Sequence, residues 1–183
     1  MFNRLFALII ILILSPIYLI IAIAIAVEDG FPILFKQKRV GVNNIIFIIY
    51  KFRSMRTDTP NVATHLLVNP SQYLLKTGSI LRKLSLDELP NLLNIVKGEM
   101  VFVGPRPSLY NQYDLIELRS NAGIDKLKPG ITGWAQINGR DNISNESKVE
   151  LEKYYMYKKT FYFDLKIIII TFMQFFNSKN ISH

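Results

Sequence analysis

The longest apolar stretch of the chain lies at its N-terminal end. Residues 5–27 contain no charged side chain and consist almost entirely of Leu, Ile, Ala and Phe. At a rise of about 1.5 Å per residue, a helix of this length extends about 35 Å, enough to cross a hydrocarbon core of about 30 Å. Only Arg4 precedes the stretch and no cleavage site follows it, unlike a signal peptide. The pattern predicts a membrane helix over residues 1–30.

Ser15 and Pro16 interrupt the middle of this stretch. A proline removes one helical hydrogen bond, which predicts a break or kink near Leu14, and the Ser15 hydroxyl can bond the carbonyl that proline frees. Two topologies fit this pattern equally well. A kinked helix can span the bilayer, or two halves of about 15 Å each can form a re-entrant hairpin that keeps both basic flanks on one side.

Short β-branched runs follow the apolar stretch. Residues 33–38 and 45–52 flank the turn-forming segment Gly41-Val42-Asn43-Asn44, which predicts a β-hairpin. A further short strand is expected over residues 101–103. Together with the helical patterns that follow, these strands predict an α+β domain over residues 31–183.

The rest of this domain has mainly helical periodicity. The C-terminal run 167–176 is too short to span a bilayer, and is either an amphipathic helix in the membrane interface or a buried core helix. Helices are expected over residues 74–84, 89–96, 110–122 and 148–176, a loop over 57–70, and glycine-rich turns over 128–140.

Composition narrows the chemistry. The chain has no cysteine, which excludes disulfides, thiolate metal sites and thiol nucleophiles. Its two histidines, His65 and His183, make a histidine zinc centre unexpected. Lys and Arg outnumber Asp and Glu by 22 to 14, an excess that suits phosphorylated substrates, anionic lipid or nucleic acid. The membrane helix favours lipid and phosphorylated substrates over nucleic acid.

Two adjacent carboxylates stand out in Ser85-Leu86-Asp87-Glu88-Leu89-Pro90. Taken alone, the motif is typical of a helix start: Ser85 and Glu88 can form a capping box, or Asp87 can be the cap with Pro90 in the first turn. Either arrangement places the carboxylates at a helix N-terminus beside Arg82. That environment keeps a carboxylate ionised, as a nucleophile or a Mg²⁺ ligand requires.

Five basic residues are candidates for binding phosphate: Arg82, beside the acidic pair, and the four described next. Arg106 lies between two prolines, so it is either presented to phosphate from a stiff backbone or solvated in a rigid turn. Lys51 and Arg53 share one face of a predicted strand, as a phosphate clamp or as edge-strand charges. Arg140 ends a glycine-rich stretch that either approaches a nucleotide or forms a surface loop. No Walker A loop, dinucleotide-binding glycine motif or nucleophile elbow occurs.

Together these segments resemble the monotopic phosphoglycosyl transferases, the bacterial sugar transferases that begin capsule, O-antigen and related glycans. The resemblance covers nearly the whole chain, and several motifs in one order are more specific than any of them alone. They are Ser15-Pro16, Phe35-Lys36-Gln37-Lys38-Arg39-Val40-Gly41, Tyr50-Lys51-Phe52-Arg53-Ser54-Met55, Ser85-Leu86-Asp87-Glu88-Leu89-Pro90, Gly104-Pro105-Arg106-Pro107, Lys128-Pro129-Gly130-Ile131-Thr132-Gly133 and Asp164-Leu165-Lys166.

The resemblance implies a two-step reaction. Asp87 would attack the sugar-bearing phosphate of a UDP-sugar and release UMP, and the aspartyl phospho-sugar would then pass to polyprenyl phosphate. Glu88 would bind Mg²⁺, together with Asp87, or manage a proton. Arg106 would hold phosphate, and Lys51 would be a further active-site residue.

The resemblance also implies a topology and a location. Ser15-Pro16 would form a re-entrant helix, giving a monotopic protein on the cytoplasmic face of the bacterial inner membrane, in contact with membrane lipids and compatible with a homo-oligomer. The chain departs from the family pattern at Ala7, Asp141 and Glu152. A non-catalytic, membrane-anchored basic binding module is the alternative function.

Overall fold

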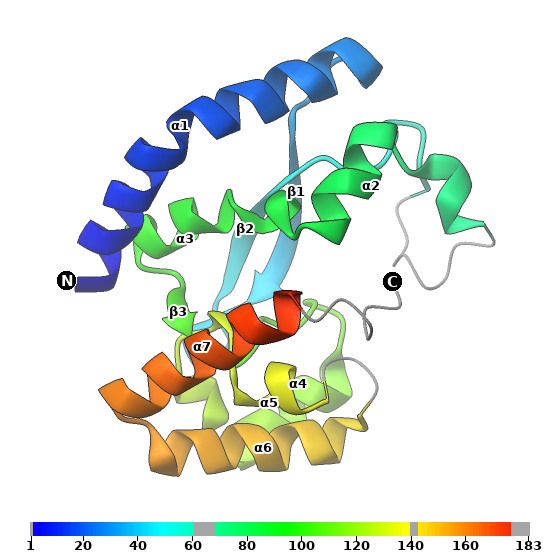
Figure 1. Cartoon of the computed structure of the whole chain (residues 1–183). Helices are drawn as coiled ribbons and strands as arrows, with labels where there is room; N and C mark the ends of the chain where they lie inside the picture. Colours follow the sequence, from blue (N-terminus) through cyan, green and yellow to red (C-terminus); the bar gives the residue numbers. More distant parts are fainter. Residues whose placement is uncertain (1, 61–68, 140–142, 177–183) are drawn as a thin grey trace.

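The computed structural model describes residues 2–60, 69–139 and 143–176, and has an α+β fold. A long N-terminal helix lies along one side of a small mixed domain, and the C-terminal helices pack on the opposite side (Figure 1). Two two-stranded sheets lie between them within the described residues. His65, Arg140, Asp141, His183 and residues 61–68 of the predicted loop lie outside the described residues.

The N-terminal helix α1 runs from Phe2 to Asp29 and continues through Pro16. Helix α1 is therefore continuous where a break was predicted near Leu14. The backbone hydrogen bond that Pro16 cannot make is replaced by a bond from a neighbouring side chain. Ser15 Oγ donates to Leu12 O at 2.8 Å, and Leu12 O is the carbonyl that would otherwise accept from the missing Pro16 amide. The predicted role of the Ser15 hydroxyl is confirmed.

Both halves of α1 pack against the same domain. Ala7 is fully buried in a cluster with side chains of the hairpin and of the helix α3. Ile21 and Ile25, beyond Pro16, are buried in a second cluster that includes Phe52 and Leu81. The outer face of α1 stays exposed, and among the described residues α1 alone is long and apolar enough to cross a membrane by length and composition.

The predicted hairpin is confirmed. Strands β1 (Leu34–Val40) and β2 (Ile46–Phe52) pair antiparallel around a short turn. Helix α3 (Asn91–Lys97) closes the free edge of β2 through Asn94, whose Oδ1 accepts from Tyr50 N at 3.3 Å and whose Nδ2 donates to Ile48 O at 2.6 Å. This edge contact places the residues before α3 beside the end of β2.

The second sheet pairs β3 (Val101–Val103) parallel with β4 (Gly130–Thr132). The strand β3 was expected, but β4 and the short helix α5 (Trp134–Asn138) lie where only turns were predicted. Gly130 is required by close packing: a Cβ placed there would come within 2.1 Å of Gly104 N. The glycines of this stretch therefore permit a close backbone contact between strands, which a turn-based interpretation misses.

The remaining helices assemble the C-terminal half. The predicted helix over residues 148–176 is two helices, separated at residues 159–160. The last one has a mixed character, because Ile167 is fully buried whereas Phe172 and Met173 are exposed on its other side. Its buried face fits the expectation of a core helix, whereas the placement of its exposed face in a membrane interface stays a prediction. The elements are α2 (Lys76–Lys83), α4 (Tyr113–Asn121), α6 (Asn145–Lys158), α7 (Phe161–Phe176) and short 3₁₀ turns at Pro70–Tyr73, Leu86–Glu88 and Ile124–Lys126.

Candidate active site

The two adjacent carboxylates lie on a separate turn between α2 and α3. Leu86–Glu88 forms a single 3₁₀ turn, which we call the catalytic turn, and Ser85 before it has a left-handed backbone with φ of 50°. Neither predicted helix cap forms in this described segment: Ser85 makes no capping hydrogen bond, and Pro90 itself is the residue before the first turn of α3. Because the turn and α3 are distinct, Asp87 and Glu88 are not needed to begin a helix.

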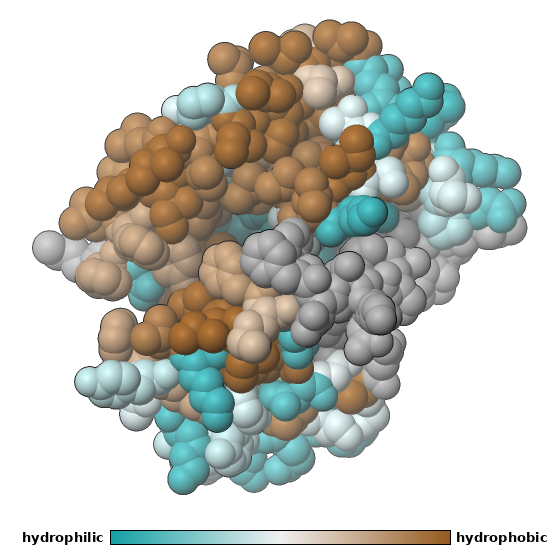
Figure 2. All heavy atoms as spheres, viewed as in Figure 1, coloured by the Kyte–Doolittle hydropathy of each residue, from teal (hydrophilic) through white to brown (hydrophobic). Residues whose placement is uncertain are grey.

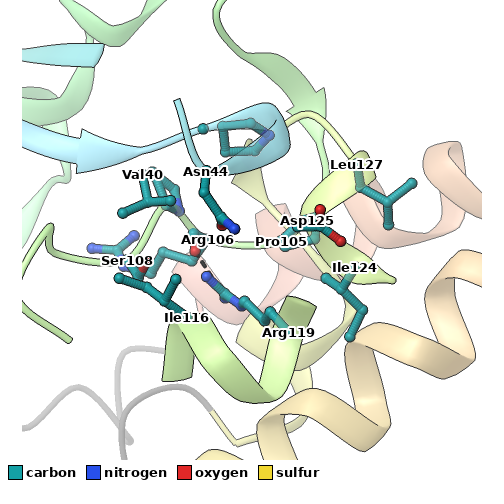
Figure 3. Close-up of a pocket in the computed structure, with 13 residues that line it drawn as sticks. Val40, Asn44, Pro105, Arg106, Ser108, Ile116, Arg119, Ile124, Asp125 and Leu127 are labelled. Carbon is teal, nitrogen blue, oxygen red and sulfur yellow. Dashed lines mark hydrogen bonds between the residues drawn. The ribbon is translucent and has the colours of Figure 1, made fainter. Parts of the chain in front are cut away.

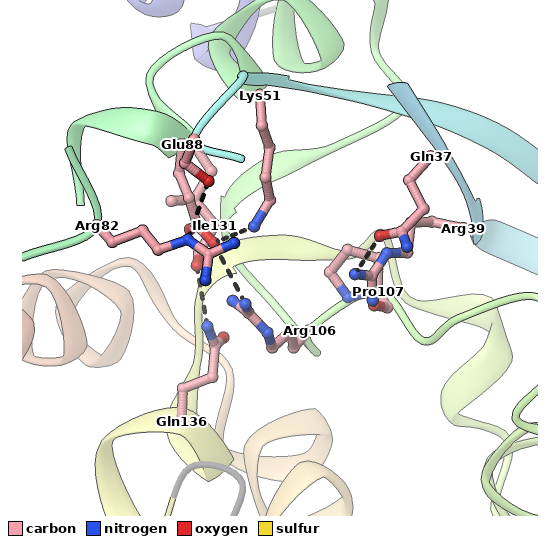
Figure 4. A network of polar contacts seen from close by, with 10 residues as sticks. Gln37, Arg39, Lys51, Arg82, Glu88, Arg106, Pro107, Ile131 and Gln136 are labelled. Atoms are coloured by element: carbon pink, nitrogen blue, oxygen red, sulfur yellow. Dashed lines mark hydrogen bonds and ion pairs between the residues drawn. The ribbon is translucent and has the colours of Figure 1, made fainter. Parts of the chain in front are cut away.

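Glu88 is the centre of an ion cluster. Its Oε1 accepts from Lys51 Nζ at 2.7 Å and lies 3.2 Å from Arg106 Nη2 (Figure 4). Burial alone would raise the pKa of this carboxyl, but Arg106 and Lys51 outweigh burial and lower the pKa to about 2. Glu88 is therefore a permanent anion that holds two cations in place from β2 and from the segment after β3.

Asp87 has the opposite electrostatic environment. Burial raises its pKa above the ordinary value, and the neighbouring Glu88 anion adds to that effect, whereas Lys51 and Arg82 oppose it. The two adjacent carboxyls are thus displaced in opposite directions. A carboxylate whose anion is poorly solvated is more basic and more reactive than an exposed one, while cations nearby still allow it to ionise.

The four predicted basic residues that the structure describes do not all gather here. Lys51 and Arg106 bind Glu88, and Arg82 lies close enough to Asp87 to influence its pKa while its Nε donates to Ser54 Oγ at 2.9 Å. Arg53 lies elsewhere. It is 5% exposed and donates to the carbonyls of Asp29 and Gly30 at 2.9 and 2.8 Å, which ties the end of α1 to the hairpin.

Three residues that the sequence did not single out line or border the site. Arg39 donates to Pro107 O at 3.0 Å and to Gln37 Oε1 at 2.7 Å. Gln136 donates to Ile131 O at 3.0 Å from below the cluster. Asn91 is 2% exposed, and its Oδ1 has no hydrogen-bond partner among the described residues. Arg39 could have been found from strand alternation, which places it on the same face as Gln37. Asn91 gave no such signal, because it resembled an ordinary residue at a helix start.

A buried ion pair between Arg119 and Glu152 contacts the backbone of Arg106. Arg119 of α4 binds Glu152 of α6 through two guanidinium nitrogens. Nε donates to Oε2 at 2.8 Å, and Nη2 donates to Oε1. Arg119 Nη2 also donates to Arg106 O at 2.9 Å, beside a small cavity lined by Val40, Ser108 and other side chains (Figure 3). Glu152, one of the positions at which the chain departs from the pattern it resembles, makes this contact with both of its carboxylate oxygens.

The two carboxylates of the site are ligands of the kind that Mg²⁺ requires. This ion favours oxygen ligands, and proteins often bind it through one or two carboxylates with substrate phosphates and waters completing its shell. Asp87 and Glu88 supply two such carboxylates. Within the described part of the chain, no group of three or more acidic, histidine or cysteine side chains is placed to hold a metal ion by itself. The residues present fit an ion held jointly with substrate phosphates.

Comparison with known proteins decides the family. The family model described as bacterial sugar transferase matches residues 1–178. The chain belongs to the bacterial sugar transferase family. It is 45% identical over 157 residues to the sugar transferase EpsL of Bacillus subtilis, an alignment that covers 86% of this chain and 76% of EpsL.

Two further relatives of this sugar transferase have more specific names. The chain is 38% identical over 181 residues to the UDP-glucose:undecaprenyl-phosphate glucose-1-phosphate transferase of Escherichia coli, covering 94% of this chain and 39% of that protein. It is 34% identical over 187 residues to the exopolysaccharide production protein ExoY of Rhizobium meliloti, an alignment that covers 93% of this chain and 81% of ExoY. The chain therefore spans most of EpsL and ExoY but less than half of the E. coli relative.

Proposed function

We propose that this sugar transferase moves a phospho-sugar from a UDP-sugar to polyprenyl phosphate and releases UMP, as the first membrane step of surface polysaccharide synthesis. The observation that carries the proposal is the pairing of a half-buried Asp87, whose pKa burial raises, with the Lys51–Glu88–Arg106 cluster in a domain packed against a long apolar helix. The name of the E. coli relative, which specifies a UDP-sugar donor and undecaprenyl phosphate as acceptor, supports the same reaction.

In the first step, the Asp87 carboxylate attacks the phosphorus that bears the sugar. A bond forms between Asp87 Oδ and that phosphorus, and the phosphoanhydride bond to the UMP phosphate breaks, so UMP leaves with the electron pair. Both reactants are anionic and would repel each other. Lys51, Arg82 and Arg106 offset that repulsion, because cations close to a phosphoryl group stabilise the charge that builds up on its oxygens.

In the second step, an oxygen of polyprenyl phosphate attacks the same phosphorus. The acyl-phosphate bond breaks, Asp87 is restored as a carboxylate, and polyprenyl diphospho-sugar is released. Glu88 remains ionised throughout because of its low pKa, so it keeps Lys51 and Arg106 oriented during both displacements.

Asp87 and Glu88 would hold a Mg²⁺ ion at this site together with phosphate oxygens of the substrates. When bound, such an ion neutralises the phosphates and favours departure of the UMP group. Lys51 and Arg106 contribute positive charge in the same region, with side chains 18% and 39% exposed. The chain therefore brings its own cations to the phosphates besides the ion.

We further propose a monotopic arrangement on the cytoplasmic face of the membrane. Both halves of α1 pack against one domain, which supports a helix that lies in or re-enters one leaflet over one that crosses to the other side. Apolar side chains gather over α1 and over the exposed face of α7 (Figure 2). In this arrangement Asp87 would lie at the depth where a lipid phosphate meets a soluble nucleotide.

The test is UMP release from a panel of UDP-sugars with undecaprenyl phosphate and Mg²⁺, comparing wild type with Asp87→Asn. Wild type should release UMP with at least one donor, and Asp87→Asn should lose about a thousandfold or more because the amide is not a nucleophile. Asp58→Asn is the matched control, since Asp58 is exposed and pairs with Arg56.

Three results bear on the proposal. A donor used by wild type alone identifies the sugar and supports the aspartyl intermediate, which mass spectrometry of the Asp87 peptide should then detect. An Asp87→Asn variant with full turnover contradicts the nucleophile. Wild type without turnover on any donor contradicts the reaction and favours a binding role.

A further inference from the structure

One hydrogen bond joins helix α1 to Leu89, the residue that directly follows the catalytic turn. Tyr18 lies two residues after Pro16, and its hydroxyl donates to Leu89 O at 2.6 Å, across 71 positions of sequence. Leu89 follows Glu88 immediately. The reaction proposed above depends on Asp87 and Glu88, so this contact connects the placement of α1 with the placement of both carboxylates.

Packing fixes the Tyr18 ring. The ring meets Phe52 edge to face, with centroids 5.4 Å apart, and Phe52 is 3% exposed. Tyr18 also packs on the cluster of Ile21, Ile25 and Leu81. Leu86 of the catalytic turn and Leu89 after it pack against the same cluster. A hydroxyl on a ring held in this way has little freedom, so its bond to Leu89 O restrains both partners.

The catalytic turn has weak support of its own. Its backbone bonds are long, with Glu88 N to Ser85 O at 3.3 Å and Leu89 N to Leu86 O at 3.2 Å. Leu89 O also accepts from Leu92 N at 3.0 Å at the start of α3. The Tyr18 bond, at 2.6 Å, lies at the short end of the range for an O–H···O bond, whereas the two bonds within the turn lie at or beyond the long end of the range for N–H···O bonds.

We propose that Tyr18 is a positioning residue that fixes the catalytic turn against the membrane helix. It does not touch the reacting atoms; it acts through Leu89 on the neighbouring carboxylates. A shift of α1 in the lipid is transmitted to Asp87 through this bond, so the seating of the helix sets the attack geometry. This inference rests on the proposed function for its effect on rate, but the anchor itself is a property of the fold.

The test uses Tyr18→Phe in the full chain, reconstituted in phospholipid nanodiscs. The variant keeps the ring and removes only the hydroxyl. We expect kcat for UMP release to fall about tenfold with KM for the UDP-sugar within about twofold, because displacement of a reacting group lowers the rate steeply whereas Lys51 and Arg106 are unchanged. Tyr50→Phe is the control: Tyr50 accepts from Lys97 at the outer face of the hairpin and should retain wild-type kinetics.

A second measurement reports on the anchor without turnover. Amide hydrogen exchange across residues 88–93 should be several-fold faster in Tyr18→Phe than in wild type and unchanged in Tyr50→Phe, with the melting temperature little altered. Unchanged exchange, or a kcat equal to wild type, overturns the inference. Faster exchange in a protein whose wild type shows no turnover supports the anchor and contradicts the proposed function instead.

Discussion

Two arginine–carboxylate clusters flank the Arg106 segment, and they differ in charge balance and in exposure. In the first, two cations share Glu88, and the side chains of Lys51, Glu88 and Arg106 are 18%, 21% and 39% exposed. In the second, Arg119 and Glu152 are matched one to one, 9% and 2% exposed. The first cluster has a surplus of positive charge facing a pocket, whereas the second is closed and neutral.

The difference separates two uses of the same chemistry. An open cluster with surplus cations can bind substrate phosphate oxygens while its carboxylate keeps those cations oriented. A closed pair in a dry interior offers nothing to a substrate, but leaving one partner alone there is very unfavourable. Since Arg119 also binds Arg106 O, the closed pair holds the backbone from which the open cluster extends its arginine.

The largest expected effect comes from breaking the closed pair. Glu152→Gln leaves the Arg119 charge buried without a counter-ion and should lower the free energy of unfolding by about 3–5 kcal/mol. In a chain of this size that corresponds to a melting temperature lower by roughly 10 °C, measured by thermal unfolding in detergent or nanodiscs.

The double variant Arg119→Met with Glu152→Leu is the control for this prediction. Replacing both charges by apolar side chains of similar volume should recover much of the lost stability, because no unpaired charge stays buried. If Glu152→Gln were as stable as wild type, the pair would contribute no more to stability than a surface ion pair. The contrast between the two clusters would then fail.

The second effect concerns activity rather than stability. Arg106→Ala removes one phosphate-binding cation from the open cluster and should lower kcat/KM for UMP release about a hundredfold, with a melting temperature within a few degrees of wild type. Arg56→Ala is the matched control, since Arg56 is exposed and pairs with Asp58. A stability loss as large as that of Glu152→Gln, or full activity, would erase the distinction between the two clusters.

Local patterns predicted the elements and the residues of the open cluster. Alternation along the predicted strand placed Lys51 and Arg53 on one face, and the adjacent acidic pair made Asp87 and Glu88 candidates. The helical period located α2, α3 and α4 to within a few residues. These features could be predicted because each depends on positions close together in the sequence, where the spacing of apolar and polar residues is visible.

The closed cluster had no such signal. Arg119 and Glu152 are 33 residues apart on two helices, and each alone resembles a surface charge. Arg53 follows the same alternation as Lys51, yet the end of α1 captures it through Asp29 and Gly30. Contacts between distant elements depend on packing, which a periodicity analysis of one segment does not contain.

The smallest expected effects concern the two adjacent carboxyls and have opposite signs. The pKa of Glu88 is lowered to about 2, so its ionisation stabilises the fold above pH 4.5, the ordinary value, and this contribution is lost as pH falls from there through about 2. Glu88→Gln should therefore be less stable than wild type at neutral pH by about 1–3 kcal/mol, and the gap should close on acidification.

Asp87 should behave in the opposite way. Because burial raises its pKa, ionisation at neutral pH disfavours the folded state, and that penalty disappears as pH falls through the folded-state pKa. Asp87→Asn should thus be more stable than wild type at neutral pH while being inactive. Melting temperatures of the three proteins between pH 7 and pH 3 check both signs at once. If both variants moved in the same direction, the two carboxyls would share one environment, and the assignment of Asp87 as nucleophile beside a permanent Glu88 anion would lose its physical basis.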